Sequence, residues 1–112
     1  MATKQDTIDF LLDQLHGLRG VSARKMFGEY ALYADGKVVA LVCDDRLFVK
    51  LTEPGRAFAG DRYEEGFAYP GAKASMLIDD DDLERREWLE ELISVTAAAL
   101  PSKTLKSKRT GR

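Results

Sequence analysis

The sequence has 112 residues, of which 45% are hydrophobic and 32% are charged, so it predicts one globular domain rather than a disordered chain. Its single cysteine, Cys43, excludes an internal disulfide and a cysteine-rich metal site, and it fits a reducing compartment. The formal net charge is only −2, but the charges are unevenly placed.

The basic residues gather at the C-terminal end. Five of the 17 Lys and Arg residues follow Pro101 and no acid does, which leaves 12 basic against 19 acidic residues and a net charge of −7 before that point. An acidic body repels phosphate backbones, so we expect residues 1–101 not to bind nucleic acid. Residues 102–112 are expected to be a disordered tail, with weak nucleic-acid binding as the alternative. The basic tail residues are Lys103, Lys106, Lys108, Arg109 and Arg112.

The N-terminal residues, MATKQDTID, are polar and lack the apolar segment of a signal peptide. No apolar run approaches the roughly 18 residues that a membrane-spanning helix needs. These two features and the lone cysteine predict a cytoplasmic protein.

A first helix is predicted over residues 5–18, because apolar residues recur there at helical spacing. Thr3 and Asp6, three residues apart, predict a capping box with Asp in place of Glu. The apolar stripe consists of Ile8, Leu11, Leu12, Leu15 and Leu18.

The next part of the chain changes to the alternating period of β-strands. Asp35-Gly36 predicts a type I′ hairpin turn, in which both central residues need a positive φ. Asp44-Asp45 predicts a second two-residue turn. Two successive tight turns predict an antiparallel meander from Lys25 to Lys50, because parallel strands would need long crossovers. The strands are expected at residues 24–28, 30–34, 37–43 and 46–51.

The third of these strands is apolar on both sides, as in a central strand whose two faces are both covered. One helical layer covers one face, and a partner or a second subunit is expected on the other. The two predicted faces carry Val38, Ala40 and Val42, and Val39, Leu41 and Cys43.

The second half predicts a short helix, two strands and a last helix. Thr52, Glu53 and Pro54 are typical of an N-cap and a first helical turn. Pro70-Gly71-Ala72 favours a type II turn. The predicted class is α+β, a two-layer antiparallel sheet with flanking helices in the order αβββ(β)αββα. The remaining elements are expected at residues 52–59, 67–69, 73–78 and 81–99.

No catalytic or metal-binding constellation stands out. The run Asp79–Asp82 lacks the spacing of an EF-hand, and consecutive helical residues diverge by about 100° each, so helix-start electrostatics explains it better. Nothing in the sequence places Cys43 beside His16, and acidic neighbours raise the pKa of a thiol. Glycine-rich phosphate loops and GxSxG are absent. We therefore predict a protein that is not an enzyme and uses no cofactor or metal.

A partner surface is the remaining candidate site. Aromatic residues alternate with polar ones on the meander, beside cationic residues, which suits a partner or dimer contact; core packing is the alternative. The turn from Pro70 to Lys73 is either a ligand loop or a plain hairpin turn. The candidate surface consists of Tyr33, Val39, Leu41, Arg46, Phe48, Lys50 and Tyr69.

Read from Val21 to Arg56, the string VSARKMFGEYALYADGKVVALVCDDRLFVKLTEPGR resembles the TfoX/Sxy family, in particular its N-terminal domain. The resemblance covers residues 1–101, outside the tail. Glu29 departs from the pattern, since many members have a second Gly there. The elements that carry the resemblance are Lys25-Met26-Phe27-Gly28, Tyr30–Tyr33, Asp35-Gly36, Leu47–Lys50, Thr52-Glu53 and Tyr69–Lys73.

This resemblance implies a fold similar to type III secretion chaperones and a role in regulating competence genes, in which the protein acts with a transcription activator rather than by catalysis. Longer members carry a second domain resembling helix-hairpin-helix modules; this sequence contains no such stretch, so DNA binding is not carried over. The expected function is a non-enzymatic protein-interaction domain, with a homodimer as one arrangement. The alternatives are a nucleic-acid-binding accessory protein that uses the basic tail and a secretion-chaperone-like partner-binding protein.

Overall fold

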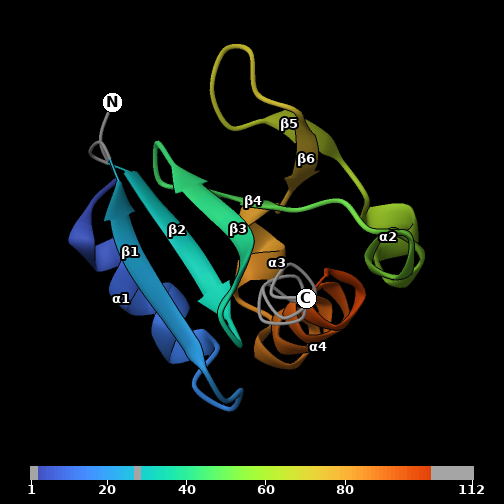
Figure 1. Cartoon of the computed structure of the whole chain (residues 1–112), viewed down its shortest axis with the longest axis horizontal. Helices are drawn as coiled ribbons and strands as arrows, with labels where there is room; N and C mark the ends of the chain where they lie inside the picture. Colours follow the sequence, from blue (N-terminus) through green and yellow to red (C-terminus); the bar gives the residue numbers. More distant parts are fainter. Residues whose placement is uncertain (1–2, 27–28, 102–112) are drawn as a thin grey trace, which may run out of the picture.

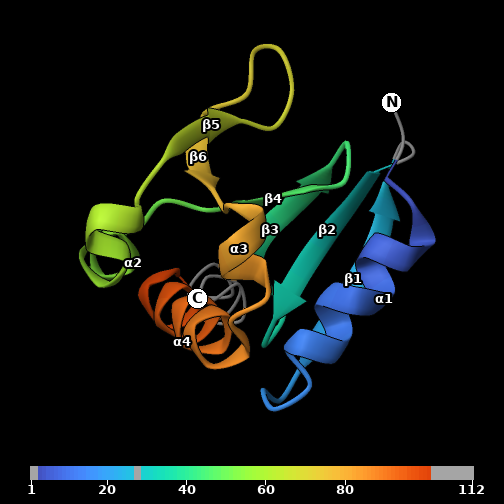
Figure 2. The same ribbon diagram turned by 180° about the vertical axis from the view of Figure 1, so that it is seen from behind.

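The computed structural model describes residues 3–26 and 29–101 of the chain. One antiparallel sheet carries helices α1, α3 and α4 on one side, and Figures 1 and 2 show these helices behind and in front of it, respectively. The predicted α+β class and element order are confirmed. The elements are α1 (Gln5–Gln14), β1 (Val21–Met26), β2 (Glu29–Ala34), β3 (Lys37–Cys43), β4 (Arg46–Val49), α2 (Glu53–Ala59), the 3-10 helix η1 (Gly60–Arg62), β5 (Glu65–Phe67), β6 (Ala74–Leu77), α3 (Asp80–Leu83) and α4 (Arg86–Ala99).

The six strands are ordered β1-β2-β3-β4-β6-β5, and all neighbours are antiparallel. The predicted turns of the meander are confirmed. Asp35 and Gly36 have φ values of 54° and 79°, and Asp44 and Asp45 have 55° and 61°. Aspartate tolerates this left-handed region better than most non-glycine residues, so the second turn forms without glycine.

The pairing of β2 with β3 contains an irregularity that the alternating pattern did not predict. The register shifts between Leu32 and Tyr33, which leaves Val39 as an extra residue on β3. Val39 is 1% exposed and packs in the core under the helices. The prediction that it shares a face with Leu41 was therefore wrong, because the bulge turns its side chain to the helical side.

The core lies between the sheet and the helices. Alternate residues of β2, β3, β4 and β6 meet the apolar stripes of α1 and α4, as their periodicity predicted. None of the described helices has the length and hydropathy needed to cross a lipid bilayer. The largest fully buried side chains are Ile8, Leu11, Leu15, Leu32, Val39, Val42, Leu47, Val49, Met76, Leu89, Leu92 and Ile93.

Thr3 joins the start of α1 to the turn between β3 and β4 instead of capping the helix. Its hydroxyl donates to the Glu29 carboxylate at 2.6 Å and accepts from the Asp45 backbone N–H at 3.3 Å. The Asp45 carboxylate accepts from the Lys4 backbone N–H and the Thr7 hydroxyl, both at 2.8 Å, and these bonds lower the pKa of Asp45. The capping box predicted at Thr3 was wrong.

The hairpin of β5 and β6 is offset from its prediction. The strands were expected at residues 67–69 and 73–78, but β5 ends at Phe67, so Tyr69 lies in the connecting loop. The type II turn in that loop is confirmed: the Ala72 N–H donates to the Tyr69 carbonyl at 3.0 Å and Gly71 has a φ of 86°.

The helix predicted over residues 81–99 is broken into α3 and α4. Asp79 caps α3 with its side chain, as helix-start electrostatics suggests. Asp82 is 2% exposed and accepts from Arg62 at 2.8 Å and from Arg85 at 3.4 Å. Arg85 leaves the helical conformation, with φ −93° and ψ 85°, and this residue marks the break.

The contact between α2 and α4 supports a test of the packing with two identical substitutions. The buried Thr96 hydroxyl near Gly55 has no hydrogen-bond partner among the described residues, whereas the Thr52 hydroxyl accepts from the Gly55 N–H at 3.0 Å. Thr96→Val should raise the free energy of unfolding by about 1 kcal/mol, because a buried polar group is removed. Thr52→Val should lower it by about 1 kcal/mol, because the cap of α2 is lost. Urea unfolding measures both, and effects of equal sign would contradict this packing.

Candidate functional site

One row of side chains crosses the sheet on the side opposite α1, α3 and α4. Directly opposed residues of antiparallel strands point to the same face, and the row runs from β1 to β6. We call this side the open face. Its row consists of Arg24, Ala31, Leu41, Phe48 and Leu77.

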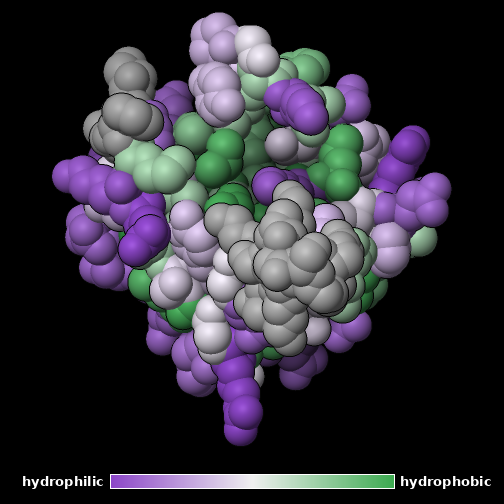
Figure 3. All heavy atoms as spheres, in the orientation of Figure 1, coloured by the Kyte–Doolittle hydropathy of each residue, from purple (hydrophilic) through white to green (hydrophobic). Residues whose placement is uncertain are grey.

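Two hollows lie on the open face under the loop that joins β5 to β6. The larger, of about 650 Å³, extends between Phe48 on the sheet and Tyr69 on the loop. The smaller, of about 570 Å³, reaches Met26 on β1. They share Leu41, Ala68 and Tyr69, so they lie next to one another, and we call the two together the groove. Figure 3 shows hydrophobic side chains within the hollow beside the hairpin at the top of the molecule.

The hairpin rests on the ring of Phe48. A Cβ atom at Gly66 would lie 3.3 Å from that ring and 3.1 Å from Leu77, so β5 approaches the ring closely because residue 66 has no side chain. Phe48 is consequently only 5% exposed, although no described helix covers its face. The hairpin thus supplies cover that the helices do not, and its loop forms a wall of the groove.

The groove carries charge at both ends. The lining of the larger hollow includes Lys50 and Lys73 and no acid. The lining of the smaller hollow includes Glu29 and no cation. The groove also has apolar residues: Leu41 on the sheet lines both hollows, and Leu51 after β4 lines the larger one.

A family model for the TfoX N-terminal domain matches residues 13–100. The chain belongs to the TfoX N-terminal domain family. It is also 44% identical over 102 residues to a protein from Spirochaeta aurantia named as an uncharacterized 12.7 kDa protein in the trpE 5′ region. That similarity spans 91% of this chain and 87% of the relative.

The TfoX N-terminal domain brings most of the predicted partner surface together. Leu41 and Phe48 lie on the open face. Tyr33 lies near Arg24 of the same row, whose guanidinium is 5.9 Å from the centre of the Tyr33 ring. Arg46 pairs with the strand-end residue Cys43 beside the groove. Lys50 and Tyr69 line the groove. Val39 is the exception, because it lies in the core.

Sequence reasoning missed two exposed apolar residues of this surface. Met26 is 41% exposed and Leu51 is 37% exposed, and both line the groove. The sequence could have indicated that Leu51 is exposed, because it is an apolar residue just before a helix N-cap and outside any predicted apolar stripe. The predicted tail residues after Pro101 lie outside the described part of the chain.

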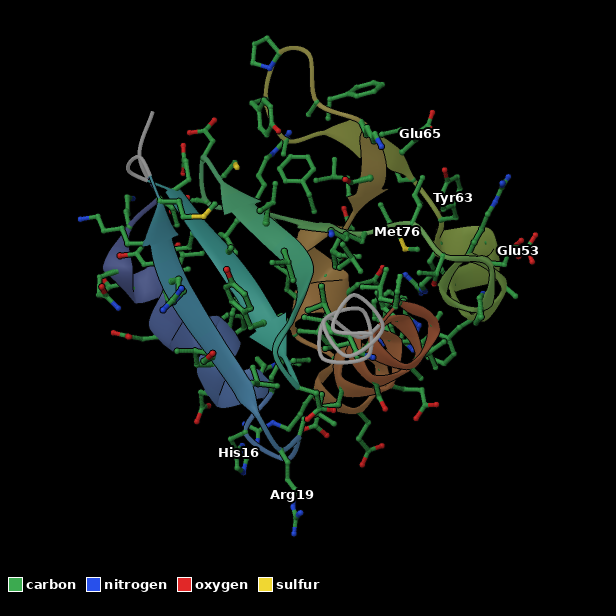
Figure 4. The ribbon with its side chains drawn as sticks, viewed as in Figure 1. His16, Arg19, Glu53, Tyr63, Glu65 and Met76 are labelled. Carbon is green, nitrogen blue, oxygen red and sulfur yellow. The ribbon has the colours of Figure 1, made fainter. Side chains whose placement is uncertain are left out.

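The thiol and the imidazole are far apart. Cys43 ends β3 beside the turn that binds the first residues of α1, whereas His16 follows the other end of α1 (Figure 4). They are separated by about the length of α1, roughly 15 Å. Among residues 3–26 and 29–101, no group of three His, Cys, Asp or Glu side chains is placed to hold a metal ion.

Cys43 is a buried thiol with a raised pKa, caused first by its burial and then by the charges of Glu29 and Asp44. The native protein should therefore react with iodoacetamide far more slowly at pH 8 than the urea-unfolded chain. Because the folded state holds the thiol proton more tightly, stability from this group is present at neutral pH and is lost as pH rises through the raised pKa.

The pH dependence of alkylation measures this pKa. Asp44→Asn keeps a residue that tolerates a positive φ and removes one of the charges, so it should lower the midpoint without unfolding the protein. A midpoint for the unsubstituted protein below the ordinary value of about 8.5 would contradict this description of the thiol.

Proposed function

We propose that this TfoX N-terminal domain is a non-enzymatic protein-interaction domain, which acts in the cytoplasm with a transcription activator in the regulation of competence genes. Membership of the family supports the link to competence. The partner and the regulated genes are part of the proposal.

The observation that carries the proposal is the apolar character of the open face. Tyr69, Met26 and Leu51 are 55%, 41% and 37% exposed, and they line the two neighbouring hollows of the groove. Clustered exposed apolar side chains of this kind mark interaction sites, whereas single ones are ordinary. We infer that the transcription activator contacts the groove.

Two exposed aromatic residues of the same hairpin provide a matched test. Tyr69 lines both hollows, whereas Phe67, which is 60% exposed, lines neither. Tyr69→Ala should reduce co-precipitation of the activator with the full chain about tenfold or more, because exposed aromatic anchors dominate many interfaces. Transcripts of competence genes should change in the same cells.

Phe67→Ala is the control and should retain both properties. Circular dichroism and urea unfolding establish that the two variants are equally folded. Equal loss in the two variants, or normal activator binding and transcription with Tyr69→Ala, would sink the proposal.

A further inference from the structure

We propose that the groove binds a segment of a partner protein in which large apolar side chains are combined with acidic ones, the carboxylates lying against Lys50 and Lys73. This inference rests on the proposed interaction function and names the chemistry of its partner. It depends on three features of the groove: its charge, its apolar floor and its length.

The larger hollow of the groove has a charge opposite to that of the body. Residues before Pro101 have 12 basic and 19 acidic side chains, yet the larger hollow is lined by two lysines and no acid. Within the described residues, neither Lys50 nor Lys73 forms an ion pair or a side-chain hydrogen bond, in contrast to Lys37, which donates to the carbonyls of Ala97 and Leu100. Two unpaired ammonium groups that line the same hollow favour a ligand with carboxylates.

The floor of the groove suits apolar side chains. Leu41 and Phe48 are opposite one another on β3 and β4, and Leu51 and Tyr69 line the same hollow. Tyrosine in such a position offers a large, stiff contact area with a polar tip. A purely polar acidic segment would leave these side chains exposed, so the segment needs apolar residues beside its acids.

The shape favours a chain segment over a compact small molecule. The two hollows together reach from the β5–β6 loop to Met26 at the end of β1, and they lie on the surface of the sheet (Figure 3). Glu29 lies in the smaller hollow, so repulsion places the acidic end of the segment at the lysines.

The loop wall contains a hydrogen-bonded turn, which favours binding. Pro70 fixes one φ, and Gly71 occupies the left-handed position of the type II turn. The adjoining strand rests on Phe48 through Gly66. A wall fixed in this way loses little conformational freedom when a segment binds.

Selection from a phage-displayed library of random 12-residue peptides on the purified full chain tests the proposal. Enriched peptides should contain Asp or Glu together with several large apolar residues. The double variant Lys50→Glu with Lys73→Glu should enrich Lys or Arg instead, and it should bind a peptide selected on the unsubstituted chain about tenfold more weakly or worse.

Arg19→Glu with Lys25→Glu is the matched control, because it changes the net charge equally at exposed residues outside the groove. Figure 4 shows Arg19 pointing away from the molecule at the loop after α1. This control should select the same acidic peptides as the unsubstituted chain.

Several results would overturn the proposal. The first is that the selected peptides show no enrichment of Asp or Glu. The others are that the groove variant selects the same peptides as the unsubstituted chain, or that the control variant switches to basic peptides as the groove variant does. If peptides bind only to a chain that ends at Pro101, the occupant of the groove is the tail and not a partner. If Leu41→Glu abolishes self-association, the occupant is a second copy of the chain. The peptide selection uses no activator, so its result is independent of the competence experiment. Either experiment can fail while the other succeeds.

Discussion

The placement of α1, α3 and α4 on one face of the sheet is the constraint on which the rest of this structure depends. The β-bulge at Val39 brings one more large side chain to that face, so β3 contributes Val39, Ala40 and Val42 to a single core. The opposite row, through Leu41 and Phe48, remains apolar but has none of the helices of residues 3–26 and 29–101 above it. An apolar row without a helical layer needs another kind of cover.

The β5–β6 hairpin supplies part of that cover and leaves the groove beside it. Gly66 lets β5 lie against the ring of Phe48, and Tyr69, at the start of the turn at Gly71, lines both hollows together with Leu41. The cover stops short of Met26 and Leu51. The groove thus follows from two features of the described residues: their helices lie on one side of the sheet, and the hairpin covers only part of the other side.

The meander could be predicted because it depends on neighbouring residues. The features that were not predicted depend on contacts between residues distant in the sequence. The Asp35-Gly36 turn and the bounds of β3 follow from neighbouring residues, so they were predicted correctly. The bulge at Val39 and the break before α4 depend on cross-strand register and on the buried Asp82. Tyr33 and Phe48 of the surface were visible in the alternation of the strands, whereas Tyr69 lies in a loop that was expected to be a strand. Met26 and Leu51 were not, because only the packed structure shows which face the helices leave open.

Site-specific photocrosslinking in living cells tests most directly whether the open face is the contact surface. A benzoylphenylalanine at position 69 or 51 lies in the groove, whereas one at position 91 lies at an exposed position of α4 on the other side of the sheet. If the open face is the contact surface, positions 69 and 51 should crosslink to the same protein, the activator, and position 91 should not. Crosslinking to that protein from position 91 but not from the groove would contradict it.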